Sequence, residues 1–130
     1  MPTVYRLTDS QAPVTVSAMR EALKTWASKR KGARVEFSAW SSEIHTVTVW
    51  HYDTIIVFAE FTDQCCITLD HGGYWSATTK RFINEVCGIM RKLIGAELHT
   101  YQHKNEWYTD YQTKTGTASY FWVGSVNFYI

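Results

Sequence analysis

The stretch LDHGGYWSATTKRFINE, Leu69–Glu85, decides the fold that this sequence predicts. Its first residues have the character of a strand end, and Gly72 and Gly73 form a tight turn after it. A polar segment then leads into an amphipathic helix, which the apolar spacing predicts over residues 78–94, with Gly95 just beyond its end. The stretch therefore predicts a strand, a glycine turn and a helix in direct succession.

Before this stretch, the hydrophobic pattern has a period of two, which is typical of half-buried strands. We expect strands at 33–39, 46–51, 54–61 and 65–69. Tyr52–Asp53 and residues 62–64 are the expected hairpin turns. Four successive strands with such short connections indicate an antiparallel meander.

The flanking segments complete the predicted architecture. We expect a short strand at 4–7, a first helix over 17–30 with Ser17 as its N-cap, and later strands at 98–103, 106–112 and 118–130. The prediction is an α+β fold: a single domain over residues 1–130, with an antiparallel sheet of about six to eight strands and two helices packed on one face.

Composition sets the broad class of the protein. The chain has 130 residues, of which 45% are hydrophobic and 19% charged, so a globular domain with its own core is expected. No segment approaches the roughly 20 apolar residues of a membrane span, and the first residues lack a signal-peptide pattern, so we expect a soluble cytoplasmic protein without membrane partners.

Cys65, Cys66 and Cys87 lack the spacing of a zinc site or a disulfide framework. We therefore expect reduced thiols and neither a metal nor a cofactor.

The second half of the chain resembles a family of small, uncharacterised proteins from phages and related mobile elements. The residues that carry the resemblance are Tyr52, Thr54, Leu69, Gly72, Gly73, Thr78–Arg81, Asn84, Glu85, Tyr101, Gln102, Lys104, Trp107 and Tyr108. They span residues 46–112, so the first helix and the last strand lie outside the pattern. The family has no assigned chemistry, and the resemblance implies a viral or mobile-element origin.

An anion site is one hypothesis for the glycine turn. Gly72 and Gly73 allow backbone N–H groups to approach a ligand, Thr78 and Thr79 offer hydroxyls, and the cations that follow add charge. The spacing matches neither nucleotide-binding fingerprint. A capped helix after a tight turn is the alternative explanation.

The histidines suggest a hydrolase or nuclease as another alternative. His51 and Asp53 are two residues apart, as on one strand face, and Asp70 precedes His71. No serine or cysteine nucleophile stands in a diagnostic context, and histidines in surface turns explain the same pattern. We therefore expect no enzymatic activity.

A set of cations and one tryptophan forms the predicted contact surface for a protein partner or a nucleic-acid backbone. Its members are Lys29, Arg30, Lys31, Arg34, Trp40, Lys80 and Arg81. A solvated end of the first helix is the simpler explanation for the charges near residue 30, since cations in a last turn complement the helix dipole.

The aromatic content is high, with six Trp, eight Tyr and six Phe, which is more than one small core is expected to hide. Our leading hypothesis is a non-enzymatic phage or mobile-element accessory protein that binds and modulates a host protein or nucleoprotein complex. Defence or gene-expression machinery is the expected target, as for an inhibitor of the anti-CRISPR kind. Direct nucleic-acid binding is the alternative, and residues 119–130 predict a homodimer if that strand lies at an edge.

Overall fold

A computed structural model describes residues 7–39, 44–62, 64–73 and 76–130. Within these ranges the chain is a single α+β domain with two helices and eight strands, as predicted. The elements in chain order are α1 (Val16–Ser28), β1 (Ala33–Ala39), β2 (His45–His51), β3 (Thr54–Phe61), β4 (Cys65–Asp70), α2 (Ala77–Ile94), β5 (Glu97–His103), β6 (Glu106–Thr113), β7 (Gly116–Phe121) and β8 (Ser125–Tyr129). The strand expected at 4–7 falls almost entirely outside the described residues, and Leu7 itself is not in a strand.

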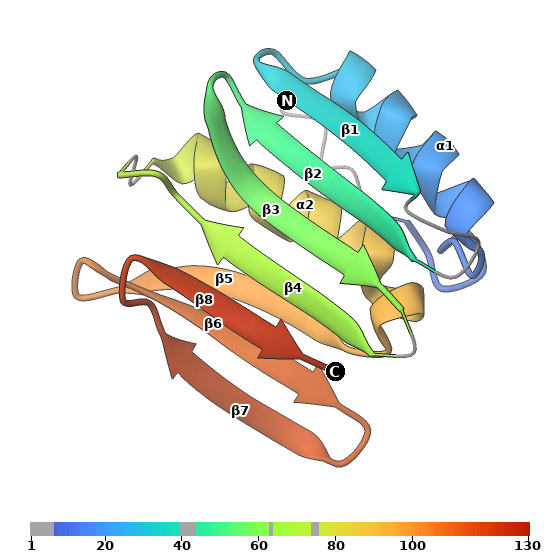
Figure 1. Cartoon of the computed structure of the whole chain (residues 1–130). Coiled ribbons are helices and arrows are strands. Elements are labelled where there is room, and N and C mark those ends of the chain that lie inside the picture. The colour runs from blue at the N-terminus through green and yellow to red at the C-terminus, as the bar shows by residue number, and fades with distance from the viewer. Residues whose placement is uncertain (1–6, 40–43, 63, 74–75) are drawn as a thin grey trace.

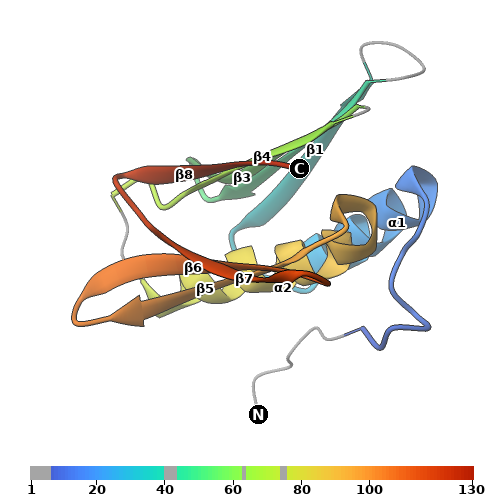
Figure 2. The ribbon, with the colours of Figure 1, turned by 90° about the horizontal axis from the view of Figure 1, so that it is seen from below.

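The domain has two layers (Figures 1 and 2). One layer is an antiparallel five-stranded sheet with the order β1-β2-β3-β4-β8, which contains the predicted meander. The other layer consists of α1, α2 and a three-stranded antiparallel sheet with the order β5-β6-β7. Both helices therefore pack on one face of the large sheet, and the small sheet continues their layer.

The last predicted strand, 118–130, is two strands in the structure. β7 stays beside β6, whereas β8 crosses to the other layer and pairs with β4. The bend between them is held by Trp122, which is buried and donates from Nε1 to Thr109 Oγ1 at 2.7 Å. Gly124 follows with a φ of 77°, a value that favours glycine. The expectation of one long strand was wrong because this bend transfers the chain between layers.

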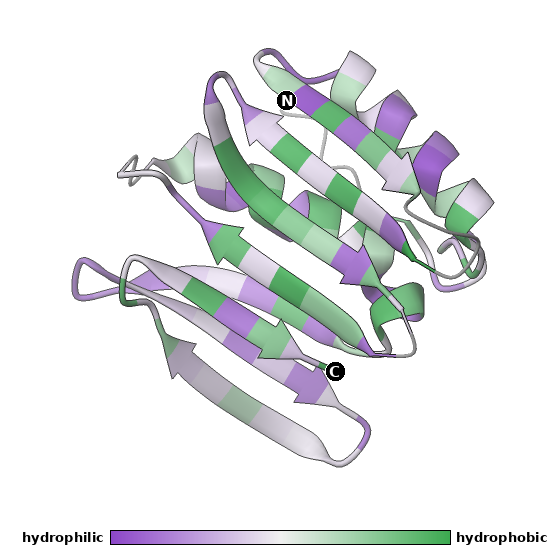
Figure 3. Cartoon of the chain, in the orientation of Figure 1, coloured by the Kyte–Doolittle hydropathy of each residue, from purple (hydrophilic) through white to green (hydrophobic). Residues whose placement is uncertain are grey.

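Hydrophobic and polar residues alternate along the strands, and the hydrophobic core lies between the two layers (Figure 3). The inner face of the large sheet contributes residues such as Ile67 and Leu69, which are fully buried. Trp26 from α1 and Phe82 from α2 meet edge to face, with ring centroids 5.3 Å apart. Within the described ranges, neither helix has the length and apolar character that a membrane span requires.

The helix ends follow ordinary capping chemistry. Ser76 caps α2 by accepting from the Thr79 N–H at 3.1 Å, and Gly95 ends the helix in the left-handed conformation, at the position that the sequence predicts. Thr15, not Ser17, caps α1 through a bond from the Ala18 N–H. Ser17 lies inside the first turn, so that prediction was wrong by two residues.

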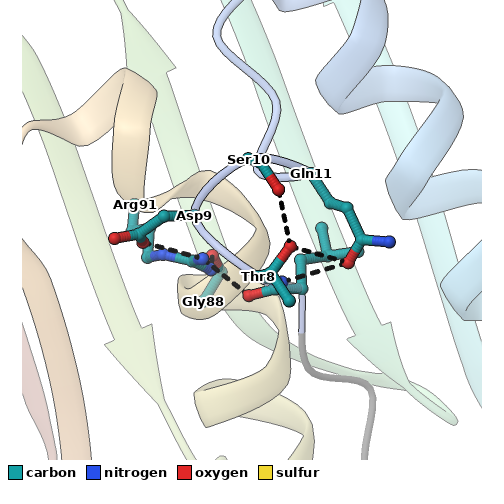
Figure 4. A network of polar contacts seen from close by, with 7 residues as sticks. Thr8, Asp9, Ser10, Gln11, Gly88 and Arg91 are labelled. Atoms are coloured by element: carbon teal, nitrogen blue, oxygen red, sulfur yellow. Dashed lines mark hydrogen bonds and ion pairs between the residues drawn. The ribbon is translucent and has the colours of Figure 1, made fainter.

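An arginine of α2 holds the segment that precedes α1 (Figure 4). Arg91 donates to the carbonyl of Gly88 at 2.6 Å and to the carbonyl of Leu7 at 2.7 Å. Its guanidinium also lies 3.4 Å from the Asp9 carboxylate. These bonds attach the chain around Leu7–Asp9 to the outer side of α2.

Candidate binding surface

The glycine turn between β4 and α2 is closed by its own side chains. The N–H of Gly72 donates to Asp70 Oδ1 at 2.8 Å, and the N–H of Gly73 donates to His71 Nδ1 at 2.9 Å. Both glycines have positive φ, 57° and 86°. The two N–H groups expected to meet an anion are therefore used inside the turn.

The threonines of the same hypothesis differ from each other. Thr79 is buried, and its hydroxyl receives a bond from Ser76 Oγ and contacts His51 Nδ1 at 3.1 Å. Thr78 is exposed at the start of α2. The geometry favours the structural explanation, in which the turn positions a capped helix.

The histidines and acidic residues of the hydrolase alternative make contacts with other residues and not with one another as a catalytic pair. His51 bonds to Thr79 and packs on the Phe82 ring at 5.0 Å, whereas Asp53 lies in the exposed β2–β3 turn. His71 is buried and stacks on Trp122 at 5.6 Å, so its expected place at the surface was wrong. Burial lowers the pKa of both imidazoles, although nearby Asp70 opposes this shift at His71.

All three cysteines are free thiols. Cys65 and Cys87 are buried, and Cys66 is partly exposed on the other face of β4. Desolvation raises the pKa of the Cys65 thiol to about 11 and that of Cys87 to about 12, so both are protonated near neutral pH. In the described parts of the chain, no three His, Cys, Asp or Glu side chains gather as a metal site would need.

Arg30 has a structural role among the predicted contact residues. Its side chain is 7% exposed and forms a two-point ion pair with Glu85, with Nε to Oε1 at 3.0 Å and Nη2 to Oε2 at 2.8 Å. Trp26 Nε1 donates to the same Oε1 at 3.2 Å. Glu85, which is not among the predicted site residues, thus joins α1 to α2.

The remaining predicted cations lie on different sides of the molecule. Lys29 and Lys31 are exposed after α1, and the Arg34 guanidinium lies 4.4 Å from the centroid of the Trp50 ring on the outer face of the large sheet. Lys80 and Arg81 lie near the start of α2, where Lys80 donates to Gln102 of β5 at 3.1 Å. Trp40 lies outside the described residues. Since β1 and β5 belong to opposite sides of the domain (Figure 1), the set is not one patch.

A row of aromatic rings lies on the outer face of the three-stranded sheet. Tyr101 of β5, Tyr108 of β6 and Phe121 of β7 are cross-strand partners, with ring centroids 5.6 and 5.5 Å apart. We call these three residues the aromatic row. Phe121 is 49% exposed, and both tyrosines are partly exposed. The row therefore offers flat apolar surface to the solvent side of the sheet.

Polar groups surround the aromatic row on the same face. His99 stacks on Tyr101, and His103 meets the Tyr108 ring edge to face. Strand alternation also places three carboxylates there: those of Glu97, Glu106 and Asp110. The Asp110 carboxylate accepts a bond from Ser119 Oγ at 2.6 Å.

The opposite face of the small sheet is closed against the large sheet. Thr100 and Thr109 are buried and share a bond between their hydroxyl groups at 2.8 Å. Tyr111 of β6 stacks on Phe128 of β8, with centroids 5.7 Å apart. The inner face thus fixes the strands whose outer face carries the aromatic row.

The large sheet also has an uncovered outer face, but its composition differs. Thr48, Phe58 and Thr68 form one cross-strand row there, and Thr68 donates to Asn127 of β8 at 2.6 Å. The same face also carries the charged side chains of Arg34 and Glu36, and the Trp50 ring there contacts Arg34. Ring-to-ring contacts across strands distinguish the small sheet as the better candidate surface.

The aromatic row was not among the predicted site residues. Its signal in the sequence was the aromatic alternation of the last strands, but only strand register shows which rings share a face. No family model, curated protein or solved structure matches this chain. The aromatic row is therefore the candidate binding surface on its geometry alone.

Proposed function

We propose that this chain is a non-enzymatic binding protein whose contact surface is the outer face of the three-stranded sheet. The partner that fits is a protein surface presenting arginine or lysine side chains. The observation that carries this proposal is the aromatic row, in which Tyr101, Tyr108 and Phe121 lie side by side across three strands.

Aromatic rings suit this role because they supply large contact area at little cost in conformational entropy. Tyrosine and tryptophan are over-represented among residues that dominate interface energies. The cross-strand contacts of the row hold its rings in place before binding, which reduces the entropy lost on association. A partner would therefore meet a preformed surface.

The charges on this face favour a protein over a nucleic acid. Glu97, Glu106 and Asp110 share the face with the rings, and their carboxylates repel phosphates. The same carboxylates attract arginine and lysine, whose cationic groups also bind over aromatic rings. Charge complementarity thus selects a cationic protein surface.

A phage or mobile-element origin, with a host complex as target, is part of the proposal. It rests on the resemblance of residues 46–112, since no comparison supplies a relative. A host defence or gene-expression complex is the target class that this origin suggests. The cytoplasm of the host is the corresponding location.

The test is affinity capture from host lysate with matched baits. The baits are the unchanged protein, the variant Tyr101→Ala/Tyr108→Ala, and the control Tyr129→Ala, whose exposed ring lies on β8. Capture is repeated after nuclease treatment, and circular dichroism checks that each bait is folded. We expect one protein to be retained by the unchanged chain and the control, with and without nuclease, and to be lost from the double variant.

Two results would contradict the proposal. One is equal capture by the folded double variant and the control. The other is capture that disappears with nuclease, falls steeply with salt and is abolished by Lys29→Glu/Lys31→Glu. The second result would instead support direct nucleic-acid binding through the exposed cations after α1.

A further inference from the structure

We infer that β7 pairs with β7 of a second copy of this chain, antiparallel and with the two-fold axis at Ser119. The resulting dimer would contain a continuous six-stranded sheet made of two three-stranded sheets. This inference goes beyond the proposed function and does not depend on it.

Alternate residues of β7 direct their backbone groups away from β6. The N–H of Trp122 bonds to the carbonyl of Trp107 at 3.0 Å, so Trp122 points its backbone groups toward β6. In an antiparallel ladder this direction alternates along the strand. Thr117, Ser119 and Phe121 therefore direct their N–H and C=O groups away from β6, toward solvent, where another strand can satisfy them.

The β7 edge lacks the charged residues and prolines that usually protect an edge strand from pairing. All of β7, with the sequence GTASYF, is exposed, and it contains no charge and no proline. The opposite edge of the same sheet is closed, because the Asn84 amide bonds to both the N–H and the C=O of Thr100 on β5. The β1 edge of the large sheet carries Arg34 and Glu36.

The free edge of β8 is a weaker candidate. It is also uncharged, but Val126 and Phe128 are already buried against the small sheet and the core. Pairing at β8 would cover few exposed side chains besides Tyr129. β7, by contrast, is exposed on both of its faces.

β7 is also complementary to itself in side-chain volume. Small residues occupy its first part, 116–119, and two large rings occupy its end. Antiparallel pairing about Ser119 places Tyr120 opposite Ala118 of the second copy and Phe121 opposite Thr117. Tyr120 and Phe121 are 43% and 49% exposed in the single chain, so each ring gains a neighbour small enough to pack beneath it.

Ser119 is the residue that identifies this register, because it alone lies opposite its own copy. The change Ser119→Glu places a new carboxylate beside Asp110, which now bonds to Ser119, and opposite the same change in the second copy. Like charges directly opposite destabilise a strand pair. Mixing Ser119→Glu protein with Ser119→Lys protein places opposite charges across the axis instead.

Sedimentation equilibrium over a concentration series tests the inference. We expect the unchanged chain to dimerise, Ser119→Glu to weaken the dimer at least tenfold, and the mixture with Ser119→Lys to restore a dimer of mixed composition. Asn127→Glu, an equivalent change on the β8 edge, should leave the dimer intact. Circular dichroism establishes that each variant is folded.

Amide hydrogen exchange of the unchanged chain gives a test that needs no variant. The amides of Thr117, Ser119 and Phe121 should exchange slowly at high concentration and faster on dilution. A monomer at every concentration overturns the inference, as does a dimer that Asn127→Glu dissociates and Ser119→Glu does not. Failure of the capture experiment with Tyr101→Ala/Tyr108→Ala would leave this result untouched, because neither tyrosine lies on β7.

Discussion

At the residue scale, Glu85 shows how one buried carboxylate links two helices. Its side chain is 4% exposed and receives bonds from Arg30 and Trp26 of the α1 region. Removing it in Glu85→Ala leaves the Arg30 guanidinium buried without its carboxylate. We expect the free energy of unfolding to fall by about 3–5 kcal/mol.

Urea denaturation of both variants measures this effect against a matched control. Glu21 pairs with Lys24 at 3.4 Å, but the two side chains are 73% and 57% exposed. Glu21→Ala should therefore change the free energy of unfolding by no more than about 0.5 kcal/mol. Equal effects of the two changes would contradict the role given to Glu85.

Replacing each of the two turn glycines, Gly72 and Gly73, by alanine should lower the stability of the protein by different amounts. A Cβ at Gly72 would clash with Thr54 Cγ2, whereas a Cβ at Gly73 would meet no atom of the described residues. Both residues have positive φ, which costs about 1–2 kcal/mol for alanine. We expect Gly72→Ala to destabilise the protein clearly more than Gly73→Ala in urea denaturation.

A second change locates the cause of this difference. Thr54→Ser removes the methyl group that the new Cβ would strike. Adding it to Gly72→Ala should recover part of the lost stability. No recovery in the double variant would show that the clash with Thr54 is not the source.

The buried imidazole of His71 should make stability depend on pH. Burial lowers its pKa in the folded state, so the unfolded chain takes up the proton first as the pH falls through the ordinary value of 6.5. Protonation of Nδ1 would also break the bond from the Gly73 N–H. The free energy of unfolding should therefore decrease between about pH 7.5 and about pH 5.

The variant His71→Asn keeps a short polar side chain but removes this titration. Urea denaturation at the two pH values should show a smaller loss of stability for His71→Asn than for the unchanged chain. His99→Asn, at an exposed position of β5, should lose as much stability between the two pH values as the unchanged chain does. The opposite order would contradict the assignment to His71.

Local residue chemistry was predictable where it depends on near neighbours in sequence. Gly95 at the end of α2 was identified correctly, because the end of a helix is set by residues within one turn of it. The partners of Arg30 and His71 were not, because Glu85 and Trp122 lie about fifty residues away along the chain. Their pairing follows from how the helices and strands pack.

At the element scale, Asn84 connects α2 to the β5 edge. Its amide oxygen accepts from the Thr100 N–H at 2.7 Å, and its amide nitrogen donates to the Thr100 carbonyl at 2.9 Å. A helix side chain thus occupies the place of a neighbouring strand. The edge of the small sheet on this side is closed to other chains.

Removing this amide should loosen β5 locally. Asn84→Ala leaves both backbone groups of Thr100 without partners, and we expect a loss of about 2–3 kcal/mol in unfolding free energy. Amide hydrogen exchange at Thr100 should accelerate. Unchanged exchange at Thr100 in folded Asn84→Ala protein would contradict this account of the edge.

Hydrophobic periodicity predicted most helices and strands correctly. It did not predict that the last strand is divided into two. Residues 118–130 alternate as one strand, but Trp122 and Gly124 bend the chain, and β8 joins the other sheet. Periodicity records which residues face a core and not which sheet supplies it. The two-sheet arrangement therefore required the structure.

At the scale of the whole molecule, the two layers each have an outer sheet face, and among the described residues only the small sheet carries a row of touching rings on that face. The aromatic excess predicted an exposed aromatic surface in general terms. The predicted contact residues were instead the cations, which the fold separates. Placing Tyr101, Tyr108 and Phe121 together needed the register of three strands.

The central claim is that the outer face of the three-stranded sheet binds a protein partner. Chemical-shift mapping tests it most directly, with isotope-labelled protein titrated with the captured partner. We predict that the largest changes fall on the ring signals of Tyr101, Tyr108 and Phe121 and on the neighbouring His99 and His103. Changes concentrated on Lys29, Lys31 and Arg34, with the ring signals of the small sheet unmoved, would contradict it.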